Sequence, residues 1–179
     1  MWQRFLSAAA MLFLVTAGLA ATEYALTGSN TSVTFIGTKP NGKHDGGFKT
    51  LTGTATLPDN DLTKLKIEVE IDTNSLYSDN PKLTNHLKSP DFFGVKTNPT
   101  SKFVTTKVEK DGSGYRVTGD LTLLGKTKSI TFPAQISIAA GTLNVTSKFT
   151  IDRTQWGMTY GQGKVDNDVT LGVKIAAKK

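Results

Sequence analysis

The chain has 179 residues, of which 37% are hydrophobic and 20% charged, and its formal net charge is +6 at pH 7. It contains no cysteine, which excludes disulfides and thiolate metal sites. The lysines are scattered along the chain, so we expect a solvated basic surface and no nucleic-acid partner.

The first twenty residues have the three-part layout of a secretory signal peptide. Arg4 supplies an early positive charge, Phe5–Val15 is apolar, and small residues lead up to Ala20. The apolar run is shorter than the roughly 20 residues that span a membrane. We therefore favour cleavage after Ala20 over an uncleaved N-terminal anchor. The prediction is a periplasmic or secreted protein with one domain, residues 21–179.

Alternation of apolar and polar residues with period two dominates the rest of the chain and indicates half-buried strands. In chain order, the predicted strands are 24–27, 32–38, 47–57, 65–71, 102–110, 115–123, 130–138, 143–151 and 169–175. The sequence Asp111–Gly114 is a strong hairpin signal. Eight or nine strands joined mostly by short turns predict either a sandwich or a closed barrel.

One segment departs from this alternation and predicts a short helix near residues 80–89. Asn80 and Pro81 suit a helix N-terminus, two leucines follow at a spacing of four, and Pro90 ends the segment. The helix falls inside the longest irregular connection, residues 73–101. Long connections of this kind often cover a site.

The chain offers little catalytic machinery. Its two histidines, His44 and His86, lack metal-binding spacing, and no serine stands in a nucleophile-elbow pattern. The glycine-rich stretch Gly42–Gly47 lacks the spacing of a phosphate-binding loop and leads into a strand. We therefore predict no catalytic residues, no metal ion and no resident cofactor.

Two local features point to an apolar site. Phe92 and Phe93 are adjacent in a predicted loop, where they either plug a barrel end or line a ligand cavity. Arg153 lies close to Trp156, the only tryptophan after the predicted signal peptide. The pair either forms a stacked structural cap or places a cation near a polar or anionic headgroup.

Taken in order, these features resemble the YceI-like domain family, exported lipocalin-like proteins described as polyisoprenoid binders. The most specific similar stretches are His86–Phe93 and Gly119–Lys128, with Ser32–Phe35, Ile71–Leu76 and Arg153–Met158 as further matches. The similarity spans essentially the whole predicted mature chain. It implies an all-β, antiparallel, eight-stranded lipocalin-like barrel with the short helix over one end, wide enough for one slender ligand.

The resemblance also implies a carrier for a long apolar molecule, an isoprenoid quinone or a polyprenyl compound. Such a ligand gains about 0.8 kcal/mol for each buried methylene. The side chains predicted to contact the ligand are Phe35, His44, Phe48, His86, Phe92, Phe93, Phe103, Arg153, Trp156 and Met158. We expect a monomer or homodimer that makes transient contact with a membrane surface or a membrane redox protein.

Two alternatives remain open. A periplasmic stress-response or interaction module would have a barrel filled with its own side chains and no bound ligand. An enzyme acting on a bound lipid would need a polar cluster around His44 or His86 inside the cavity. The volume inside the barrel separates the first alternative from a carrier, and the position of the histidines bears on the second.

Overall fold

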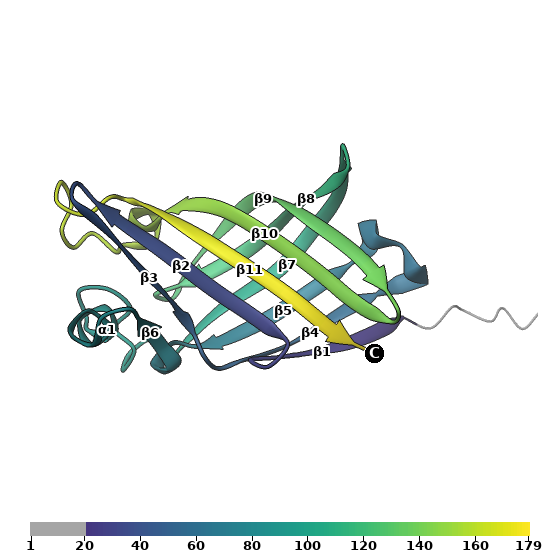
Figure 1. The fold of residues 1–179 in the computed structure, drawn as a ribbon, viewed down its shortest axis with the longest axis horizontal. Coiled ribbons are helices and arrows are strands. Elements are labelled where there is room, and N and C mark those ends of the chain that lie inside the picture. Colours follow the sequence, from purple (N-terminus) through teal and green to yellow (C-terminus); the bar gives the residue numbers. More distant parts are fainter. Residues whose placement is uncertain (1–20) are drawn as a thin grey trace, which may run out of the picture.

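The predicted alternation produces strands along most of residues 21–179, the part of the chain that the computed structural model describes. The predicted signal peptide lies outside the described residues. Eleven strands form one curled antiparallel sheet with the order β1-β4-β5-β7-β8-β9-β10-β11-β2-β3-β6 (Figure 1). The prediction of an all-β, barrel-like fold with one helix is therefore confirmed.

The first six strands are β1 Thr22–Thr27, β2 Thr31–Lys39, β3 Gly42–Phe48, β4 Leu51–Leu57, β5 Lys66–Asp72 and β6 Leu76–Ser78. The remaining strands are β7 Thr100–Asp111, β8 Gly114–Leu123, β9 Lys126–Ala139, β10 Thr142–Asp152 and β11 Asp168–Lys178. The helix is α1 Pro81–Lys88, and the 3-10 turns are η1 Pro58–Asn60, η2 Leu62–Lys64, η3 Thr73–Ser75 and η4 Arg153–Trp156.

The prediction of eight strands is wrong, because the sheet has eleven. The two strands that were not predicted are β3 and β6. β3 occupies the glycine-rich stretch, and its last two residues had been joined to β4 in the predicted strand 47–57. β6, only three residues long, adds to the edge of β3. Neither strand could be recognised from alternation, because the glycines of β3 supply no apolar side chains and β6 is too short to show a period.

The curled sheet bends back on itself near the end of β11. β11 pairs with β2, and the next residue along, Ala176, donates its N–H to the carbonyl of Asn30 at 2.8 Å. Asn30 also binds the carbonyl of Ala25 in β1 through its side chain. These bonds join the turn between β1 and β2 to the last strand, so the strands enclose an interior.

The two ends of the curled sheet differ. The end beside the C-terminus is filled with buried side chains, including Tyr24, Leu57, Leu143 and Ala177. At the opposite end, α1 and β6 lie near the connection between β10 and β11 and the turn between β2 and β3 (Figure 1). An open cavity lies in the interior towards this second end.

The predicted helix is confirmed at Pro81–Lys88. Asn80 caps it by accepting hydrogen bonds from the N–H groups of Lys82 and Leu83 at 2.9 and 3.1 Å. A cap of this type stabilises a helix by about 1 kcal/mol. The helix packs against β6, and its two leucines are half-buried, which directs its apolar face into the sheet.

β9 changes its partner strand midway. Its first part, Lys126–Ala134, pairs with β8, and its last part, Gln135–Ala139, pairs with β10. Pro133 lies at this change, which fits its missing N–H, because proline cannot donate to a neighbouring strand. The second part of β10 therefore leaves β9 and leads into η4, which packs against β9.

Candidate functional site

A cavity of about 260 Å³ lies inside the sheet at the end that α1 covers. Its surface is almost entirely apolar. The aromatic and aliphatic lining side chains come from both halves of the chain and are Val33, Phe35, Phe48, Ile71, Leu83, Leu87, Phe92, Phe93, Leu121, Leu123, Ile151, Met158, Tyr160, Val165, Val169 and Leu171. Glycine, serine, threonine and four charged or ionisable side chains complete it: Gly37, Thr38, Lys39, His44, His86, Ser101 and Arg153.

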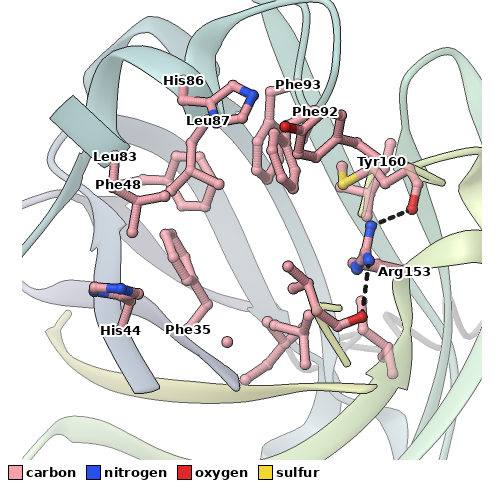
Figure 2. A pocket seen from close by; sticks show the side chains of 18 of the residues that line it. Phe35, His44, Phe48, Leu83, His86, Leu87, Phe92, Phe93, Arg153 and Tyr160 are labelled. Carbon is pink, nitrogen blue, oxygen red and sulfur yellow. Dashed lines mark hydrogen bonds between the residues drawn. The ribbon is translucent and has the colours of Figure 1, made fainter. Parts of the chain in front are cut away.

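Eight of the ten predicted ligand contacts line this cavity: Phe35, His44, Phe48, His86, Phe92, Phe93, Arg153 and Met158. Figure 2 shows His86, Phe92 and Phe93 on one side and Phe35 and His44 on the opposite side. Three of the aromatic rings form a continuous wall. The ring centroids of Phe35 and Phe48 are 6.1 Å apart, and those of Phe48 and Phe93 are 5.6 Å apart. Contact of these residues with a ligand remains a prediction.

The other two predicted contacts, Phe103 and Trp156, do not line the cavity. Phe103 packs against Phe132 deeper in the sheet, with ring centroids 5.7 Å apart. Trp156 is only 1% exposed, and its indole N–H donates to the Leu121 carbonyl at 3.0 Å. Trp156 therefore supports the wall strand β8 from outside the cavity. The predicted pairing with Arg153 rested on closeness in the sequence. In η4 the two side chains point to different partners, Trp156 to the Leu121 carbonyl and Arg153 to the Met158 carbonyl.

Arg153 is a buried cation in the cavity wall, with 4% of its surface exposed. Its guanidinium donates to the main-chain carbonyls of Met158, Val165 and Asp166, so it ties the connection between β10 and β11 to the barrel (Figure 2). It also lies over the ring of Phe92, 5.9 Å from the centroid. Burial lowers the pKa of Arg153 from its usual range, with a smaller opposite effect from Asp152.

His44 connects the rim of the barrel to the segment before α1. Its Nδ1 lies 3.0 Å from Oδ1 of Asp79. Asp79 also exchanges main-chain and side-chain hydrogen bonds with Asp45 on β3. The hydrogen bond from His44 lowers the pKa of Asp79 below its ordinary value, and the N–H of Asp45 adds to this effect. Both side chains remain partly exposed at the rim.

His86 lies on α1, the helix that covers the cavity, and connects it to the other side of the rim. Its Nε2 lies 2.9 Å from Oδ2 of Asp91, and its ring packs edge-on against Phe92 at 5.1 Å. Tyr160, from the connection between β10 and β11, packs against the His86 ring at 4.7 Å. Since His86 belongs to α1, these rings join the helix to the connection that Arg153 holds.

Sequence reasoning missed Tyr160 and most of the aliphatic wall. Tyr160 stands in an irregular connection with three glycines of positive φ nearby, where no periodicity reveals its direction. The alternation predicted that Leu121 and Leu171 face inward, but it did not distinguish them from residues of the packed core. Alternation identifies inward-facing side chains, and it does not reveal which of them border an empty volume.

Two classes of site are not found among residues 21–179. No group of three or more histidine and acidic side chains lies close enough to hold a metal ion. No helix in the same region has the length and apolar composition needed to cross a membrane.

Comparison with known proteins relates the chain to bacterial proteins. The UPF0312 protein of Serratia proteamaculans is 33% identical over 137 residues, which cover 73% of this chain and 71% of that protein. Protein YceI of Escherichia coli is 37% identical over 91 residues, which cover 51% of this chain and 48% of that protein. The second alignment thus spans about half the length of each protein.

Solved structures share the fold. BcnA of Burkholderia cenocepacia superimposes with a TM-score of 0.76 at 22% identity, over 83% of this chain and 96% of that one. A polyisoprenoid-binding domain from Saccharophagus degradans gives a TM-score of 0.67 at 12% identity, over 87% and 97%. The family model of the YceI-like domain matches residues 24–177, nearly all of the described chain. The chain therefore belongs to the YceI-like domain family.

Proposed function

We propose that this protein binds and carries a long apolar molecule, an isoprenoid quinone or a polyprenyl compound, in the cavity beneath α1. The observation that carries this proposal is the cavity itself, which is open inside an otherwise packed sheet and almost wholly apolar. Water gains little in such a space, because it finds few hydrogen-bond partners there. An apolar chain that enters the cavity removes its surface from water, and this transfer is favourable.

The size of the cavity favours a slender ligand. Its volume of about 260 Å³ lies just below the range of about 300–1,000 Å³ that is typical of pockets for drug-sized molecules. Each buried methylene of a chain contributes about 0.8 kcal/mol before ordering costs. The name of the Saccharophagus degradans domain, a polyisoprenoid-binding domain with the same fold, supports an isoprenoid chain as the ligand.

The polar groups of the cavity suit a small headgroup. Arg153, His44 and His86 are separated from one another by apolar wall, so they offer single polar contacts and no continuous polar surface. A quinone carbonyl or a phosphate oxygen would accept a hydrogen bond from such a group. These residues are therefore our candidates for contact with the headgroup, and the phenylalanines for contact with the chain.

Export and delivery complete the proposal. The predicted signal peptide supports a periplasmic or secreted protein, and a membrane-soluble ligand requires loading from a membrane or a membrane protein. We propose transient contact with one of these. The apolar site supports binding in preference to a catalytic role.

The two alternatives are less well supported. An interaction module with a filled barrel has no need for the open volume, so the cavity favours a carrier. An enzyme would use His44 or His86, both of which do line the cavity. Each of them already has an aspartate partner that is partly exposed to solvent, an arrangement that supports bracing of α1.

Native mass spectrometry tests the proposal. The protein, expressed with its signal peptide and extracted gently, is expected to carry a mass that matches an isoprenoid lipid or quinone. Leu87→Glu places a carboxylate in the apolar wall and is expected to lower the bound fraction at least about tenfold. Asn85→Glu, on the exposed side of the same helix, is the matched control and should leave it unchanged. A wild-type protein that neither carries nor accepts such a lipid would contradict the proposal.

A further inference from the structure

Deeper in the interior than the lining residues Ser101 and Ile151 lie three phenylalanines from three strands: Phe103 on β7, Phe132 on β9 and Phe149 on β10. Phe132 and Phe149 are stacked, with ring centroids 4.1 Å apart and ring planes 6° apart. Phe103 lies against the other side of the group, 5.7 Å from Phe132. We call these three rings the phenylalanine floor.

The floor lies one inward step below the cavity wall. Inward-facing side chains alternate along a strand, so the next one is two residues away. On β7 the lining residue Ser101 is followed by Phe103, and on β10 the lining residue Ile151 is preceded by Phe149. None of the three floor residues lines the cavity, and all pack with the buried core. The rings therefore mark the boundary between the open and the solid parts of the interior.

A glycine fixes the position of one floor ring. Gly119 on β8 is two residues from the lining residue Leu121, and its missing side chain makes room for Phe103. A Cβ on Gly119 would overlap the Phe103 ring, 2.6 Å from its carbon Cε2, and would also lie 2.6 Å from the main-chain carbonyl oxygen of Val104. The ring can thus lie across the interior below Leu121 without entering the cavity.

We propose that the phenylalanine floor sets the length of apolar chain that the cavity accepts, so that this protein selects ligands by chain length. This inference rests on the proposed function. A chain that reaches the floor has buried all the methylenes it can, and further units stay in the mouth or in water. Affinity should therefore rise with chain length up to a limiting length and then remain level.

The test uses isoprenoid alcohols of two, three, four and five units as probes, with binding followed by calorimetry and by Trp156 fluorescence. For the wild-type protein, Kd is expected to tighten up to about fourfold for each additional buried methylene, until the limiting length is reached. Phe149→Ala deepens the cavity and should move the limiting length to a longer probe. Gly119→Ala pushes the Phe103 ring towards the cavity and should move it to a shorter one.

Milder variants keep the test decisive where a large truncation prevents folding. Phe149→Leu should lengthen the limit slightly, and Leu121→Phe, which fills the cavity from above the floor, should shorten it. Leu143→Ala is the control. It removes a fully buried side chain at the packed end of the sheet beside the C-terminus, so it should lower the stability and leave the limiting length unchanged. A wild-type protein that binds no probe refutes the proposed function itself. Binding with the wild-type limiting length in every folded Phe149 and Gly119 variant overturns the floor and leaves the proposed function standing, and Leu121→Phe only shows that the assay detects a shorter limit.

Discussion

The ring of Phe103 on β7 lies against Gly119 on the neighbouring strand β8, in the space that a side chain at position 119 would fill. Gly119→Ala is therefore expected to destabilise the protein by about 1–3 kcal/mol, the usual cost of inserting atoms into a packed interior. Urea unfolding measures this loss. Combining Gly119→Ala with Phe103→Leu should recover part of it, because the smaller side chain relieves the overlap. Gly37→Ala is the control, since a Cβ there meets nothing within 4 Å.

Arg153 should be important for stability as well as for the cavity wall. Arg153→Met keeps the length of the side chain but leaves three main-chain carbonyls without their donor. We expect a loss of about 2–4 kcal/mol in the free energy of unfolding. Arg116→Met removes an exposed arginine bound to Asp111 and should cost less than about 1 kcal/mol. Equal losses in the two variants would contradict the anchoring role of Arg153.

Trp156 provides a spectroscopic check of the structure. Because its side chain is buried, its fluorescence should be that of an indole in an apolar environment and should move to longer wavelength on unfolding. Trp156→Phe removes the hydrogen bond to the Leu121 carbonyl and should destabilise the protein by about 1–3 kcal/mol. An unfolding curve checks this value. A solvent-exposed emission spectrum in the folded protein would be inconsistent with the position described for Trp156.

The His44–Asp79 pair makes the barrel rim sensitive to acid. The pKa of Asp79 is lowered in the folded protein, mainly by the hydrogen bond from His44. Its contribution to stability is therefore complete above the ordinary value of 3.8 and is lost as the pH falls through the lower pKa of the folded state. In His44→Ala the pKa of Asp79 should rise towards 3.8, which an NMR titration of the carboxyl carbon measures. The lowered pKa of Asp61, which Thr63 causes, should not change.

Much of the fold could be predicted from local patterns. The run from Leu65 to Ile71 alternates regularly and forms β5, and Asn80, Pro81 and Pro90 bound α1 as expected. Strand number was harder to predict, because the glycines of β3 give no apolar alternation and β6 has only three residues. Both segments become strands through pairing with a neighbour, β3 with β2 and β6 with β3.

The candidate site divides in the same way. The paired phenylalanines at 92 and 93 stood out in a loop, and both line the cavity. Phe103 showed the same inward alternation as many core residues, yet it belongs to the floor. Tyr160 could not be predicted from its sequence neighbours, because its place in the cavity wall comes from contact with His86 on α1.

The sequence by itself determined an antiparallel β-protein with one inserted helix, since alternation, caps and turns act between residues close together in the chain. Only the tertiary structure decided where the interior is filled and where it stays open. That boundary depends on side chains from β7, β8, β9 and β10 that meet at one level of the interior. Gly119 makes room for the Phe103 ring, and β9 changes its partner strand next to Phe132. Such meetings arise from packing between strands, and the order of residues within a strand does not encode them.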